Sequence, residues 1–216
     1  MSITTIDPNT ALIVVDLQGA APHMPTVHPF DGVLAKAAEL ADAFRAKKLP
    51  VVLVNVAGGA PGRTEQGFGA SAAALPDGWT DLLPELNQQP GDKTVTKYTW
   101  GAFHNTDLAE HLKDLGVTQV VVCGIATAIG VESTARQAYE HGFHVTLPLD
   151  AMTDLDAAAH ENSATLVFPR LGETRRWESS SPALVSARRS SWRRRGTRTD
   201  QLVSRKKRLI SPMIVG

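Results

Sequence analysis

The stretch VVVCGIATAIGVESTARQAYEHGF, residues 120–143, decides the fold of this 216-residue chain. The apolar run QVVVC at 119–123 predicts a strand that is buried on both faces of a parallel sheet. A turn of small residues follows, and residues 127–141 then predict a helix that ends before Gly142. A buried strand, a tight turn and a helix in this order form half of a parallel crossover unit.

The same alternation of strand and helix extends on both sides of this stretch. Periodicity predicts further strands at 11–16, 51–56, 94–97 and 143–149, and further helices at 31–48, 105–115 and 157–168. Residues 57–92, which are rich in Gly and Pro, predict a long loop with one helical turn. The chain is therefore predicted to be α/β, with a doubly wound (Rossmann-like) three-layer sandwich around a mostly parallel central sheet.

Chemistry-bearing residues fall where the predicted strands end. Asp16 ends the first strand, Lys97 ends the strand at 94–97, and the turn from Gly124 to Gly130 follows the strand at 119–123. In doubly wound folds the site lies beyond the carboxyl ends of the strands. Desolvation there would raise the pKa of Asp16 and suit it to general acid or base work. Taken alone, Asp16 could equally cap a turn and Lys97 could be an exposed strand-end lysine.

Three segments together resemble the isochorismatase-like hydrolases, also called cysteine hydrolases: VVDLQ at 14–18, TKYTWGAF at 96–103, and the stretch 120–143. The resemblance covers residues 10–174, and we assign 1–174 to one such domain. It implies that Asp16 and Lys97 are catalytic, and that Gly130 stands at the position of the nucleophilic cysteine. It also implies a cis peptide between Ile125 and Ala126.

Gly130 has no side chain, so a thioester intermediate is excluded at this position. The single cysteine, Cys123, lies in a predicted buried strand, where a small apolar core residue is expected. Isochorismatases proper resemble this chain in carrying Gly there. That resemblance implies vinyl-ether hydrolysis, in which Asp16 protonates the enol carbon, Lys97 orients the substrate and tunes Asp16, and Gly130 leaves room for the ring or water. The turn GIATAIG lacks the aromatic and His of those enzymes, so isochorismate itself stays open.

Seven residues are predicted to contact the substrate. The resemblance implies an oxyanion hole from the turn Ile125, Ala126 and Thr127. Gln18 follows Asp16 by two residues, and Arg63 on the long loop could clamp a carboxylate. Trp100 and Phe103 could wall the pocket. Arg63 could also be a solvated loop arginine, and Phe103 a core residue.

No metal, cofactor or nucleotide is expected. Asn55 stands where the zinc-binding branch of the resembled family carries an Asp, and no D-x-H follows the second strand. Neither G-x-G-x-x-G nor G-x-x-x-x-G-K-[ST] occurs.

The net charge of zero hides a division between the domain and the tail. Residues 175–216 hold 12 of the 22 basic residues and only 2 of the 22 acidic ones. This tail shows no helical or strand period. One interpretation is a disordered basic arm for nucleic acid or an anionic membrane. The interpretation we favour is a frameshifted sequence, and a nucleic-acid partner is therefore not expected.

The remaining expectations concern setting and partners. No apolar run reaches the roughly 20 residues of a membrane span, and no secretory signal is visible. A single cysteine suits a reducing compartment, so a cytoplasmic enzyme with a small-molecule substrate is expected. The resemblance implies a homodimer or homotetramer. The competing hypothesis is a catalytically silent member that binds a small molecule or a partner protein.

Overall fold

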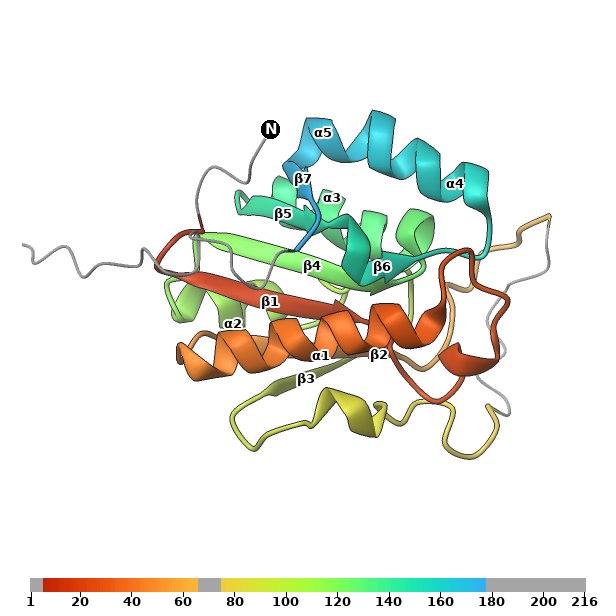
Figure 1. The fold of residues 1–216 in the computed structure, drawn as a ribbon, viewed down its shortest axis with the longest axis horizontal. Coiled ribbons are helices and arrows are strands. Elements are labelled where there is room, and N and C mark those ends of the chain that lie inside the picture. Colours follow the sequence, from red (N-terminus) through yellow and green to blue (C-terminus); the bar gives the residue numbers. More distant parts are fainter. Residues whose placement is uncertain (1–5, 66–74, 178–216) are drawn as a thin grey trace, which may run out of the picture.

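The computed structural model describes residues 6–65 and 75–177. Within them, seven strands form one sheet in the order β3-β2-β1-β4-β5-β7, with β6 paired to β4. All pairings between these strands are parallel (Figure 1). The strands are β1 (Thr10–Val15), β2 (Val51–Val56), β3 (Lys93–Lys97), β4 (Gln119–Ile125), β5 (His144–Pro148), β6 (Met152–Thr153) and β7 (Glu173–Arg175).

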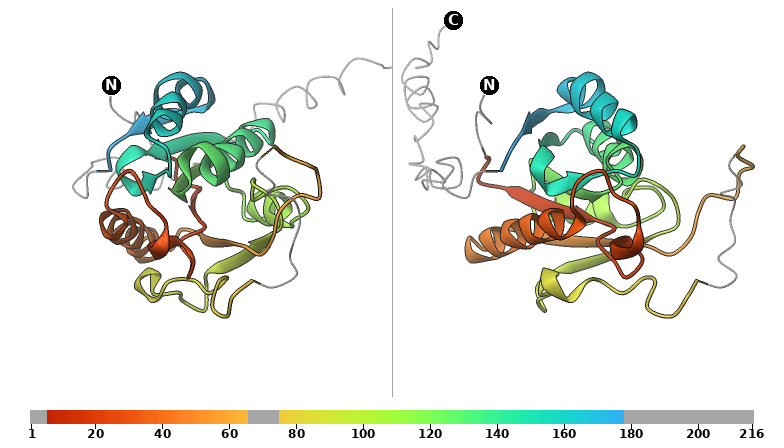
Figure 2. Two further views of the ribbon diagram at one scale, coloured as in Figure 1. Left: turned by 90° about the vertical axis from the view of Figure 1, so that its right-hand side faces the viewer. Right: turned by 45° about the vertical axis from the view of Figure 1, so that its right-hand side comes forward.

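Helices cover both faces of the sheet, which gives three layers (Figures 1 and 2). The helices are α1 (Phe30–Ala46), α2 (Leu108–Asp114), α3 (Glu132–Glu140), α4 (Ala157–Asn162) and α5 (Phe168–Leu171). Helix α1 lies on one face, and α2 and α3 lie on the other (Figure 2). The predicted doubly wound α/β class is confirmed.

Alternation along the strands divides the core into two halves. Leu12 and Val14 of β1 pack with α1, whereas Ile13 and Val15 pack with α2 and α3. All four side chains are buried, which explains why β1 is apolar without interruption.

Two short segments of the chain form π-helical turns and not regular α-helix. Residues Thr127–Val131 form a π-helical turn between β4 and α3, and Ser163–Val167 form another between α4 and α5. Such turns often occur at functional sites. Gly124 precedes the first one with φ of +118°, and a Cβ there would collide with the carbonyl oxygen of Val15. Only glycine therefore fits at this position opposite Val15.

Helix α2 differs from the prediction in its start, whereas α4 begins at the predicted residue, Ala157. Helix α2 begins at Leu108 and not at 105, because Asn105 has φ of +54° and the Thr106 hydroxyl donates to the Ala102 carbonyl. Asp156 does cap α4, accepting a bond of 2.8 Å from the Ala159 amide.

The ordered chain continues beyond position 174, the predicted end of the domain. Arg175 belongs to β7, and Trp177 is buried with its amide 2.6 Å from Asp150 Oδ1. The prediction for the rest of the tail, residues 178–216, lies outside the described residues. Within the described ranges no helix is long and apolar enough to cross a membrane.

Candidate active site

A buried ion pair joins the carboxyl ends of β1 and β3. Lys97 Nζ lies 2.7 Å from Asp16 Oδ2, and the side chains are 1% and 12% exposed, respectively. The two residues are 81 positions apart in sequence. They meet because β2 pairs with both strands, which brings the ends of β1 and β3 to the same edge. The structure thus brings together the two charged residues that the sequence predicted to share a site.

All three N–H donors of the Lys97 ammonium group have acceptors within the protein. Besides Asp16, it donates to the backbone carbonyl of Trp100 at 2.8 Å and to that of Thr99 at 3.2 Å. An ammonium has three N–H donors, and these three acceptors match them. Lys97 is therefore fixed as a partner of Asp16 and has no donor left for another group in this arrangement.

Asp16, at the end of β1, has a left-handed backbone conformation and a carboxyl group with a raised pKa. Its backbone has φ of +55°, and its amide donates to the Val54 carbonyl at 2.9 Å. Its second carboxyl oxygen, Oδ1, is buried and has no hydrogen-bond partner in the described structure. Burial raises the pKa of Asp16 to about 6, although the charge and hydrogen bond of Lys97 act to lower it. The group can therefore gain or lose a proton near neutral pH.

Gly130 lies directly against this carboxyl group. A Cβ at Gly130 would lie 3.0 Å from Asp16 Oδ2, 3.0 Å from Val15 Cγ1 and 3.2 Å from the Ile125 carbonyl oxygen. These atoms closely surround the position that a Cβ would take, and the expectation that Gly130 leaves room for a ring or water stays a prediction. A side chain here would press on Asp16.

The turn before Gly130 has the cis peptide between Ile125 and Ala126 that the resemblance implied. Three of its amides have partners within the protein. Those of Ile129 and Val131 donate to the Ala126 carbonyl at 3.1 Å, and that of Ala128 donates to Asp154 Oδ2 at 2.6 Å. An oxyanion hole in this turn would therefore have to use other amides, such as that of Thr127.

Gln18, predicted to contact the substrate, makes three bonds to two backbone segments. Its Nε2 donates to the carbonyls of Val56 (3.0 Å) and Trp79 (2.8 Å), and its Oε1 accepts from the Val56 amide (2.7 Å). The side chain is 2% exposed. Both of its amide hydrogens are thus committed to holding the end of β2 and the loop at 79.

The other predicted contact residues divide by exposure. Trp100 is 60% exposed, and its backbone carbonyl accepts a bond from Lys97. Its ring is therefore accessible at the edge of the site. Phe103 is 5% exposed and packs against Phe143, with ring centroids 6.0 Å apart, as the core alternative required. Arg63 is exposed on segment 57–65, which extends outward beyond the end of β2 (Figure 2, right).

Neither a reactive thiol nor a metal-ligand cluster occurs in the described part of the chain. Cys123 is fully buried in β4, and burial raises its thiol pKa to about 12. Among residues 6–65 and 75–177, no group of three or more His, Cys, Asp and Glu side chains could hold a metal ion.

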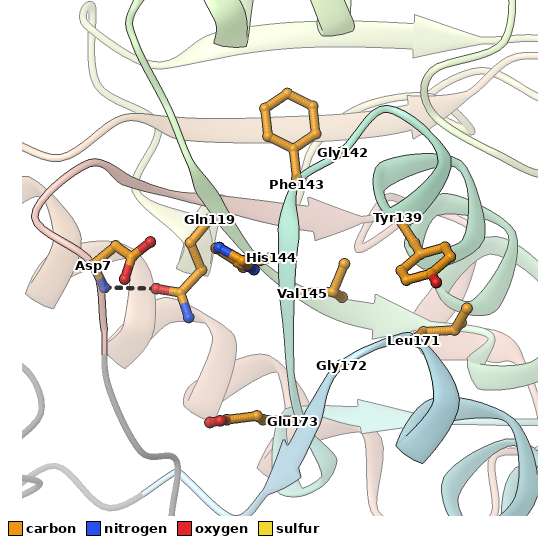
Figure 3. A pocket seen from close by; sticks show the side chains of 10 residues that line it. All are labelled: Asp7, Gln119, Tyr139, Gly142, Phe143, His144, Val145, Leu171, Gly172 and Glu173. Atoms are coloured by element: carbon orange, nitrogen blue, oxygen red, sulfur yellow. Dashed lines mark hydrogen bonds between the residues drawn. The ribbon is translucent and has the colours of Figure 1, made fainter.

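The opposite edge of the sheet carries a hollow of about 400 Å³ (Figure 3). It is lined by residues at the amino ends of the strands, among them Gln119 and His144, and by Asp7. Gln119 Oε1 accepts from the Asp7 amide at 2.7 Å across it. The hollow is therefore remote from Asp16 and does not form part of the site.

Two buried residues at the site were not predicted. Asp154 is 3% exposed and bonds the Ala128 amide, and His160 is 9% exposed with Nδ1 2.9 Å from the Thr127 hydroxyl. The only sequence signal for Asp154 was its place in the acidic run before α4, which the cap at Asp156 already explained.

Comparison with known proteins agrees with this fold. The isochorismatase domain model matches residues 10–179. The chain is 39% identical to the uncharacterized isochorismatase family protein YwoC of Bacillus subtilis (strain 168), over 78% of this chain and 90% of that protein. It is 32% identical to Nicotinamidase 3 of Arabidopsis thaliana, over 74% and 82%. A solved isochorismatase family protein from Burkholderia thailandensis has a TM-score of 0.79 and 40% identity, covering 86% of this chain and all of that one.

The fold is a doubly wound α/β sandwich with Asp16 and Lys97 together at the carboxyl edge of its parallel sheet. The chain belongs to the isochorismatase family of hydrolases, as the three sequence segments predicted.

The contact between Gly130 and Asp16 can be tested by adding one methyl group. We expect Gly130→Ala to lower the free energy of unfolding by about 1 kcal/mol, because overpacking costs about 1–3 kcal/mol and outweighs the helix preference of Ala. Urea unfolding measures this. The matched control is Gly32→Ala in α1, where a Cβ meets nothing within 4 Å, and which should gain up to about 1 kcal/mol. Equal gains for both variants would contradict the packing described.

The influence of Lys97 on Asp16 can be measured directly. We expect Lys97→Met to raise the pKa of Asp16 by about one pH unit or more, because an opposite charge and a hydrogen bond are lost. A ¹³C NMR titration of the Asp16 carboxyl reports the change. Lys36→Met, which removes a partly exposed pair with Glu39, is the control and should leave Asp16 unchanged. An unchanged Asp16 in Lys97→Met would show that the pair is not electrostatically coupled.

Proposed function

We propose that this protein hydrolyses a small molecule without a covalent cysteine intermediate, and that Asp16 is its general acid and base. One observation carries the proposal: the Asp16 carboxyl is buried, has a pKa raised to about 6, and keeps one oxygen without a partner. A group that exchanges a proton near the working pH is suited to general acid–base catalysis. Oδ1 is the oxygen left to interact with a substrate, because it has no partner and Oδ2 is bound to Lys97.

The reaction type we propose to test is vinyl-ether hydrolysis of the isochorismate kind. Protonated Asp16 gives its proton to the terminal carbon of the enol ether, and the adjacent carbon becomes an oxocarbenium ion. Water adds to that carbon and loses a proton to the Asp16 carboxylate. The resulting hemiketal breaks its bond to the ether oxygen on the ring, and its hydroxyl proton passes to that oxygen, so that pyruvate and a dihydroxylated cyclohexadiene acid leave. One water is consumed, and Asp16 ends in its starting state.

The proposed role of Lys97 is to tune and position Asp16. Its ammonium fixes Oδ2, which leaves Oδ1 as the oxygen without a partner, and its charge keeps the carboxylate form accessible after the proton has been given. Without that charge, burial would hold the carboxyl protonated and hinder its return step. The three bonds of Lys97 support this role better than direct contact with the substrate.

A covalent route is not supported by the residues present. Amide hydrolysis through a thioester requires a thiol, and position 130 is glycine. Cys123, buried in β4 with a pKa of about 12, cannot provide a thiolate near neutral pH. Although Nicotinamidase 3 is named for an amide substrate, the same chemistry is not proposed for this chain.

The setting and assembly of the enzyme also remain proposals. We propose a cytoplasmic homodimer or homotetramer. The free, buried Cys123 agrees with a reducing compartment, and the exposed side chains of Trp100 and Leu155 could lie in an interface between copies. Light scattering of the full chain would give the number of copies.

Pyruvate release from isochorismate by the full chain tests the proposed reaction. We expect Asp16→Asn to lower kcat by roughly 10²–10⁴-fold, because the amide can neither give nor accept the proton. Asp31→Asn, an exposed carboxylate at the start of α1, is the matched control and should keep full activity. Circular dichroism establishes that both variants are folded. A folded wild-type protein that releases no pyruvate would remove the isochorismate-type reaction.

The pH profile tests the protonation state that the mechanism requires. If protonation of the substrate limits the rate, only enzyme with protonated Asp16 reacts. Activity is then full below the pKa of about 6 and falls roughly tenfold for each pH unit above it. Initial rates between pH 5 and 8 measure this. A rate that increases through pH 6 would instead show that the carboxylate form acts, as a general base.

A further inference from the structure

The turn that carries Gly130 is bonded to a short segment that begins with β6, the strand paired with the end of β4. Strand β6 pairs with the end of β4, with Met152 opposite Gly124 and Thr153 opposite Ile125. This pairing places Asp154 next to the turn. We call residues 152–160, from β6 to His160 in α4, the clasp.

The first contact of the clasp replaces a missing helix cap. The π-helical turn and α3 begin after Ala126, which has no side chain that could cap them. Asp154 supplies the acceptor from 26 residues away, with Oδ2 2.6 Å from the Ala128 amide. Its other oxygen, Oδ1, accepts from the amides of Leu155 (2.7 Å) and Asp156 (3.3 Å), which fixes the carboxylate in place. A carboxylate at this position also has a favourable interaction with the helix dipole.

The second contact is buried and lies one residue earlier in the turn. The Thr127 hydroxyl, fully buried, is 2.9 Å from His160 Nδ1. Asp156 caps the helix that carries His160, so both contacts belong to one connected segment. The ring of His28 packs edge-on against His160 at 4.7 Å, and the His28 amide bonds Thr153 Oγ1 at 3.0 Å.

These contacts act on Asp16 through the turn. Gly130 lies three residues after Thr127, and the space beside its Cα is filled by Asp16 Oδ2 and Val15. A shift of the turn by a few tenths of an ångström would therefore open or close the space around the Asp16 carboxyl group.

We propose that Asp154 and His160 are positioning residues, which hold the 125–130 turn against Asp16 and so set the solvent exposure of its carboxyl group. Neither residue touches the reacting atoms. The catalytic consequence rests on the function proposed above, whereas the effect on Asp16 does not.

Titration of the Asp16 carboxyl by ¹³C NMR in the full chain tests the assignment without a substrate. We expect Asp154→Ala and His160→Ala each to lower the pKa of Asp16 from about 6 toward 3.8, by roughly half a pH unit or more, because water reaches the carboxyl and desolvation is the largest cause of the raised value. Asp154→Asn keeps one acceptor oxygen and should fall between wild type and Asp154→Ala. Asp107→Ala, which removes an exposed pair with Lys93, is the control and should leave Asp16 unchanged.

A role limited to stability would lower the melting temperature and leave the titration unchanged, and this result in folded variants would overturn the proposal. If Asp154→Ala does not fold, Asp154→Asn and His160→Ala decide. With isochorismate as substrate, the positioning role predicts a lower kcat with little change in KM. If the wild type does not turn over isochorismate, the proposed reaction fails, while the titration still decides the role of the clasp.

Discussion

The Asp16–Lys97 pair is the constraint on which the rest of the site depends. A charge that is nearly excluded from water is costly unless it is paired, and Lys97 is 1% exposed. The fold meets this cost with one carboxylate and two backbone carbonyls. Those three bonds fix the chain after β3, the end of β1 and the direction of Asp16 Oδ1 together.

Gly130 changes the chemistry that this arrangement can perform. Position 130 supplies no thiol beside the carboxyl group, and in the reaction we propose Asp16 exchanges its proton with the substrate or with water. The tight packing around Gly130 also means that the missing side chain has not left an open cavity at that position. The site therefore centres on a carboxyl group whose pKa is raised by burial and lowered by Lys97, and we propose that the turn held by the clasp contributes to that burial.

The sequence predicted the parts of the fold that depend on local pattern. Uninterrupted apolar runs identified β1, β2 and β4, and the ends of β1 and β3 identified Asp16 and Lys97. Strands β6 and β7 have only two and three residues, so pairing and not periodicity defines them. The roles of Gln18 and Asp154 were not predictable because each bonds backbone from a distant part of the chain, 38 to 61 residues away for Gln18 and 26 for Asp154.

The most direct test of this account is the pKa of Asp16 in the unmodified protein, measured by ¹³C NMR of its carboxyl carbon between pH 3 and 9. Burial that outweighs the influence of Lys97 predicts a midpoint near 6. A midpoint at or below the ordinary value of 3.8 would show a carboxylate that is ionised throughout the working range, and would contradict its role as the general acid.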